Sequence, residues 1–163
     1  MTARDRLVRL NRAAGGEASW RLWEMGEGEK VAMAWAAEMA SLTRASEALA
    51  PGRAMWLDFD SFLDAPAESL AALAAFFGVP LDAAGAEHLA ADPLMRRYSK
   101  AAEYEYSREL REEVLAEARR EQAPAIAAAL RWLDAAAQGC PAVARAVERA
   151  AAGSTDAGPA ANR

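Results

Sequence analysis

The sequence contains very little cysteine, lysine or histidine. Its 163 residues include one cysteine, Cys140, so the chain cannot form an internal disulfide or a cysteine-based zinc site. The only lysines are Lys30 and Lys100, and the only histidine is His88. A catalytic base needs a nucleophile to deprotonate and often a group that orients it, and no such motif surrounds His88. We therefore interpret His88 as a surface or helix-packing residue, and we assign no role to Cys140.

Long apolar runs and an excess of positive charge are also absent. No segment is long and apolar enough to cross a bilayer, and Met1–Arg12 alternates charged residues with leucine and valine, unlike a signal peptide. The net charge of −5 and the isoelectric point near 5.0 argue against a surface that binds nucleic acid. We therefore expect a cytoplasmic protein with no nucleic-acid or membrane partner.

Alanine and regularly spaced larger apolar residues dominate what is present. Because alanine is the best helix former, the composition favours a mostly helical fold. We expect one helical region over residues 1–152, followed by a disordered tail at 153–163, which has no apolar periodicity. The expected helical segments are Arg4–Ala14, a short element within Ala18–Met25, a helix after Gly28 that ends before Pro51-Gly52, Pro66–Phe77, Asp82–Ala91, a pair divided at Pro124 after Arg108, and Pro141–Ala152.

One short segment has the length of a strand. Ala54–Leu57 is continuously apolar, which is typical of a strand covered on both faces in a parallel sheet. A single strand leaves its backbone N–H and C=O groups without partners. This prediction therefore requires further strands, supplied by a missing N-terminal half or by a second copy of the chain.

The residues that follow this segment resemble part of the P-loop sulfotransferase family. In that family a strand ends in a Tyr-Glu-Asp-Leu type motif, and a proline and a helix ending in Phe-Leu-Gly come next. Here Phe59-Asp60-Ser61-Phe62 occupies the motif, with two of its four positions changed in character, and Pro66 and Phe77-Gly78 follow. Tyr98–Tyr104 is similar to a Ser-Lys loop of bacterial sulfotransferase-like proteins. With the helix over Glu29–Leu49, the resemblance covers roughly residues 20–135 and suggests the C-terminal part of an α/β P-loop fold.

The resemblance implies transfer of a sulfuryl group from the nucleotide donor PAPS to a hydroxyl or amine acceptor. It also implies that a basic loop contacts the 3′-phosphate of the nucleotide, a role that we assign to Lys100, Ser99 and Arg97. The family's phosphate-binding loop follows a strand near the N-terminus, and no glycine cluster here has that context. We assign no catalytic residue, and we expect the chain by itself to be inactive.

Two other interpretations remain open. Asp58 and Asp60 form an Asp-x-Asp pattern that some metal-nucleotide sites use, although we favour helix capping by Asp60 and turn hydrogen bonds by Asp58. Four of the five tryptophans, Trp23, Trp35, Trp56 and Trp132, lie in apolar patterns and are expected in the core or against a missing half. The alternative function is a helical protein-interaction module or a homodimer without catalytic activity.

Overall fold

The computed structural model describes residues 2–15, 20–97, 103 and 105–153. Within them the chain forms two compact units. The first, which we call the bundle unit, combines Met1–Ala54 with Ala118–Ala152. The second, which we call the inserted unit, consists mainly of Met55–Glu117, between the two segments of the first.

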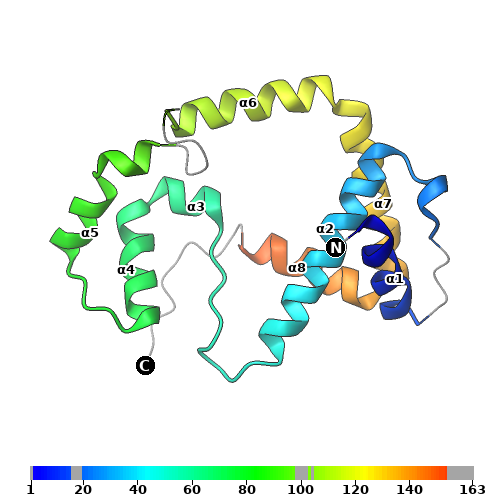
Figure 1. Cartoon of the computed structure of the whole chain (residues 1–163), viewed down its shortest axis with the longest axis horizontal. Helices are drawn as coiled ribbons and strands as arrows, with labels where there is room; N and C mark the ends of the chain where they lie inside the picture. The colour runs from blue at the N-terminus through cyan, green and yellow to red at the C-terminus, as the bar shows by residue number, and fades with distance from the viewer. Residues whose placement is uncertain (1, 16–19, 98–102, 104, 154–163) are drawn as a thin grey trace. The chain divides into compact units, whose positions relative to one another are not determined.

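The bundle unit contains four α-helices and one short 3₁₀ helix among its described residues. Helix α2 packs against both α1 and α7, as Figure 1 shows. The elements are α1 (Ala3–Ala13), the 3₁₀ helix η1 (Leu22–Glu24), α2 (Glu27–Glu47), α7 (Ala123–Gly139) and α8 (Pro141–Gly153). The last residues of α6 (Arg108–Glu121) lead into α7 and also fall in this unit. The predicted break at Pro124 is confirmed, because α6 ends at Glu121 and Pro124 lies in the first turn of α7.

Local signals explain where the first two helices begin. The Thr2 side chain accepts a hydrogen bond from the backbone N–H of Asp5, and the Asp5 carboxylate accepts one from the Thr2 backbone. At α2 the Glu29 carboxylate accepts a 2.7 Å hydrogen bond from the Gly26 N–H. Both arrangements satisfy backbone donors that a helix start leaves without partners.

Small residues allow α2 and α7 to approach closely. A Cβ atom built on Gly28 would lie 2.0 Å from the carbonyl oxygen of Ala125, so only glycine fits at this crossing. The core beneath it is completed by Leu10, Met33 and Val143, all at most 1% exposed. Trp20 and Trp132 pack beside this core with ring centroids 5.4 Å apart, which confirms the core position expected for Trp132.

The opposite face of α2 carries the larger apolar residues. Val31, Trp35 and Leu42 are 69%, 36% and 54% exposed, whereas the alanines Ala36 and Ala37 are buried. The apolar periodicity along this helix correctly predicts one face, but that face lies away from the core of the bundle unit. Trp23, expected in the core or against a missing half, is 79% exposed and is therefore not in the core of the bundle unit.

The inserted unit is built from shorter helices. They are α3 (Phe59–Asp64), α4 (Pro66–Phe77), α5 (Ala83–Ala90), the 3₁₀ helix η2 (Pro93–Arg96) and α6 up to Glu117. Pro66 occupies the first turn of α4, and Gly78 ends this helix in the left-handed conformation at φ 68°. Asp82 caps α5 through a 2.8 Å hydrogen bond from the Gly85 N–H. Both predicted helices are thereby confirmed, and Phe77 at the end of α4 is 70% exposed.

The predicted strand at Ala54–Leu57 is wrong. No described segment pairs with it as a strand, and it forms an irregular connection at the boundary between the two units. Met55, Trp56 and Leu57 are between 37% and 44% exposed, so their side chains are not covered on both faces. The segment lies between the Gly52 turn, where φ is 76°, and the Asp58 cap of α3. The expectation that a partner completes a sheet requires a strand in this chain, and the described residues contain none.

Other expectations concern the ends of the chain and His88. The first helix and the last begin and end within one residue of their predicted limits, and His88 is exposed in the last turn of α5, as expected. Apart from Gly153, the predicted tail lies outside the described residues.

Candidate functional site

The predicted nucleotide-binding residues are described only in part. Ser99 and Lys100 lie outside the described residues, while Arg97 is described and exposed. Arg97 forms an isolated antiparallel bridge with Glu105, and the Tyr106 N–H donates a 2.9 Å hydrogen bond to the Arg96 carbonyl. These contacts join the two ends of the segment that carries Ser99 and Lys100.

A pocket of about 740 Å³ lies beside this bridge, within the inserted unit. Its apolar lining comes from Leu63, Pro66, Ala90, Met95 and Leu110. Its polar lining comes from Arg96, Glu105, Tyr106, Ser107, Arg108 and Glu109. Ligand pockets commonly have this size and combine an apolar surface with a few polar groups.

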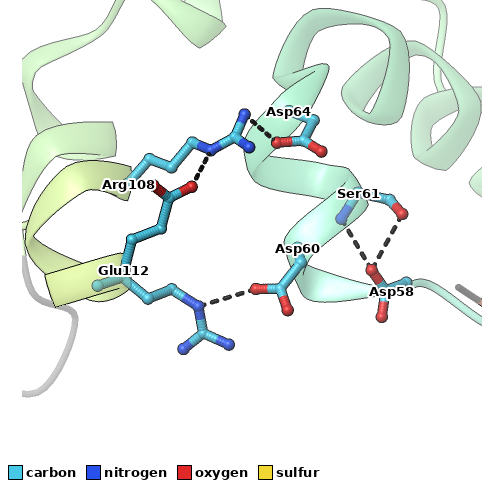
Figure 2. Close-up of polar contacts among 7 residues, drawn as sticks. Asp58, Asp60, Ser61, Asp64, Arg108 and Glu112 are labelled. Atoms are coloured by element: carbon cyan, nitrogen blue, oxygen red, sulfur yellow. Dashed lines mark hydrogen bonds and ion pairs between the residues drawn. The ribbon is translucent and has the colours of Figure 1, made fainter. Parts of the chain in front are cut away.

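Two arginines of α6 reach the carboxylates of α3 beside this pocket (Figure 2). Arg108 forms ion pairs with Asp64 and with Glu112 one helical turn further along α6. Arg111 Nε donates a 2.8 Å hydrogen bond to Asp60 Oδ1. All these groups are at least partly exposed, so solvent and salt screen the pairs. Exposed pairs of this kind contribute little to the stability of the fold.

Aromatic contacts accompany these ion pairs. The Arg111 guanidinium lies 5.3 Å from the centre of the Phe59 ring, within the range of a cation–π interaction. The Phe59 ring also lies 6.4 Å from those of Phe62 and Tyr106. Phe59, at the first position of the four-residue motif, therefore contacts residues near the pocket and is not part of a sheet.

Asp58 caps α3. Its Oδ1 accepts hydrogen bonds from the Ser61 N–H at 2.8 Å and from the Ser61 hydroxyl at 3.0 Å, as Figure 2 shows. The hydrogen bond from the backbone of Ser61 lowers the pKa of Asp58 more than any other contact does. Capping in preference to metal binding was the favoured interpretation, but the roles of the two aspartates are exchanged: Asp58 caps the helix and Asp60 pairs with Arg111.

Hydrogen bonds shift the pKa of both arginines and of one carboxylate at the start of α6. A hydrogen bond to Glu112 is the main cause that raises the pKa of Arg108, and one to Asp60 does the same for Arg111. The pKa of Glu109 is lowered, first by its own backbone N–H and then by the Ser107 hydroxyl. These shifts favour the charged forms that all three groups already have at neutral pH.

The sequence did not indicate these contacts of Arg108 and Arg111. Both residues lie about fifty positions from their partners in α3, beyond any local pattern. The only available signal was the spacing of Arg108 and Arg111, three residues apart on one helix face, and of Asp60 and Asp64, four apart on another.

Over the described residues, no helix is long and apolar enough to span a membrane, and no group of three or more metal-binding side chains occurs. No protein-family model, curated protein or solved structure matches this chain.

Proposed function

We propose that this chain is the C-terminal region of a sulfotransferase-like protein and that its Arg97–Lys100 segment contacts the 3′-phosphate of a PAPS-type nucleotide. The observation that supports this most directly is the local structure of the motif region. Asp58 caps α3, Pro66 begins α4, and Gly78 ends α4. The motif, proline, helix and glycine on which the resemblance rests thus correspond to a helix start, a helix and a helix stop, whereas the strand that precedes the motif in the family is absent from the described residues.

The bridge between Arg97 and Glu105 adds a second argument. It joins the ends of the segment that carries Ser99 and Lys100, and Arg97 itself is exposed. Arginine and lysine side chains bind phosphate oxygens through charge-assisted hydrogen bonds. Such a segment can contact a nucleotide phosphate while the remaining contacts come from elsewhere.

We further propose that the chain alone does not transfer the sulfuryl group. Donor binding in the family depends on backbone N–H groups of a loop between a strand and a helix. No described residue of this chain lies in a strand that could precede such a loop.

A thermal melt with adenosine 3′,5′-bisphosphate tests the nucleotide proposal. A ligand that binds only the folded state, at one hundred times its dissociation constant, adds about 2.7 kcal/mol of stability and raises the melting temperature. Lys100→Ala should abolish most of this shift. Lys30→Ala is the matched control, because Lys30 is the only other lysine, lies in the bundle unit and pairs with Glu27 on the surface. An unshifted melt of the wild-type protein, or equal shifts in both variants, would contradict the proposal.

The exposed apolar face of α2 favours a second candidate, a protein-interaction module. Val31, Trp35 and Leu42 follow one another at spacings of four and seven residues on this face. Contiguous exposed apolar residues mark interaction surfaces in many proteins. If two copies associate through this face, sedimentation should show a mass that rises with concentration, and Leu42→Lys should hold the protein as a monomer. A monomer at all concentrations would exclude the homodimer.

A further inference from the structure

The pocket of the inserted unit has a charge pattern that suggests its own kind of ligand. Its lining contains two arginines, Arg96 and Arg108, and two carboxylates, Glu105 and Glu109. These formal charges cancel. A multiply charged anion in the pocket would face both carboxylates, so the pocket is a poor place for the phosphates of a nucleotide.

Two of these four charged groups already have partners. Arg108 pairs with Asp64 and Glu112, and the Glu109 carboxylate accepts hydrogen bonds at the start of α6. Within the described part of the chain, neither the Arg96 guanidinium nor the Glu105 carboxylate has a hydrogen bond or an ion pair. The pocket thus offers one uncommitted cation and one uncommitted anion.

The backbone joins the two short segments that carry these groups. The Tyr106 N–H binds the Arg96 carbonyl at 2.9 Å, and Arg97 bridges to Glu105. Arg96 and Glu105 therefore come from two adjacent, antiparallel segments. The apolar part of the lining includes Leu63, Pro66 and Leu110.

We infer that this pocket binds a zwitterion with an apolar body, of the size of a short peptide, whose acidic group contacts Arg96 and whose ammonium contacts Glu105. The apolar body lies against the leucines and the proline. This inference does not rest on the nucleotide proposal, because Arg97 is not among the described lining residues and the test below uses no nucleotide.

Titration of the whole chain with the dipeptide Leu-Leu, followed by NMR, tests the inference. The methyl signals of Leu63 and Leu110 should shift and saturate. N-acetyl-Leu-Leu lacks the ammonium, and Leu-Leu amide lacks the carboxylate, while the apolar body is unchanged. Each should bind at least about fivefold more weakly than Leu-Leu does, as expected for the loss of one exposed ion pair.

Single substitutions test which residue contacts the carboxylate of the peptide and which contacts its ammonium. Arg96→Gln should weaken Leu-Leu binding and leave the affinity for Leu-Leu amide unchanged. Glu105→Gln should weaken Leu-Leu binding and leave the affinity for N-acetyl-Leu-Leu unchanged. Glu113→Gln is the matched control. Glu113 lies on α6 and outside the pocket lining, so this variant should bind Leu-Leu as the wild type does. All three residues are exposed, and backbone amide spectra will confirm that each variant folds.

Three results would overturn the inference. They are the absence of methyl shifts with Leu-Leu, equal affinity for all three peptides, and unchanged Leu-Leu binding in both Arg96→Gln and Glu105→Gln. Adenosine 3′,5′-bisphosphate is absent from this titration, so its outcome is separate from that of the nucleotide test.

Discussion

Gly28 shows how one residue controls the packing of two helices. In most helix interiors, replacing glycine with alanine stabilises the helix by up to about 1 kcal/mol. At position 28 the added Cβ would meet the backbone of Ala125, which cannot move aside as a flexible side chain can. We expect Gly28→Ala to destabilise the protein by about 1–3 kcal/mol, the usual cost of overpacking, as measured by urea unfolding.

Gly139→Ala is the control for this substitution. Gly139 also lies in a helix, and a Cβ built there would have no atom within 4 Å. We expect it to leave stability unchanged or to raise it slightly. Equal effects of the two substitutions would show that the close approach of α2 and α7 does not exist in solution.

The cap at Asp58 makes a prediction about acid. Because hydrogen bonds from Ser61 lower the folded-state pKa of Asp58 below its ordinary value of 3.8, the charged form stabilises α3. This contribution is complete above the unfolded-state pKa and disappears as the pH falls through the folded-state pKa. Asp58→Ala should cost about 1 kcal/mol at neutral pH. An NMR titration of the Asp58 carboxyl should give a midpoint below 3.8.

Asp58→Asn separates capping from titration. Asparagine caps helices about as well as aspartate but does not ionise in this range. The variant should keep α3 at neutral pH and lose the part of the acid dependence that Asp58 causes. An Asp58 midpoint at or above 3.8 in the wild type would exclude the hydrogen bonds from Ser61.

At the scale of single elements, substitutions on the two faces of α2 should differ in their effect on the free energy of unfolding. Leu42 is 54% exposed and Met33 is fully buried. Leu42→Gln should change the free energy of unfolding by no more than about 0.5 kcal/mol. Met33→Ala, which leaves a cavity, should cost about 2–5 kcal/mol. Chemical denaturation of the two variants measures both values, and a large loss in Leu42→Gln would show that another part of the protein covers this face.

The contact between α3 and α6 gives a second prediction for single elements. Arg111 pairs with Asp60 and also lies over the Phe59 ring. Arg111→Gln should therefore speed amide hydrogen exchange in α3, by less than about fivefold because the ion pair is exposed. High salt should produce part of the same change in the wild type. Arg120→Gln, near the end of the same helix, is the control and should leave exchange in α3 as it is.

For the whole molecule, the two units differ in how much they bury. Among the described residues, Ala86 is the one buried apolar residue of the inserted unit, whereas the other buried apolar residues belong to the bundle unit. Since burial of apolar area is the main stabilising contribution, we expect the inserted unit to open first. Amide exchange should be faster in α4 and α5 than in α2 and α7. Equal rates in the two units would show that they unfold together.

The sequence by itself determined the longer helices and most of their ends, but it did not predict α3 or the 3₁₀ helix η2. Thr2, Pro66, Gly78, Asp82 and Pro124 act on backbone groups only a few residues away, so their effects could be predicted without knowing the fold. The tertiary structure decided which face of α2 is buried, whether Ala54–Leu57 pairs as a strand, and which arginines meet α3. Each of these depends on what lies opposite in space. A helix period shows that apolar residues share a face, but a close approach such as that of Gly28 and Ala125 determines which face turns inward.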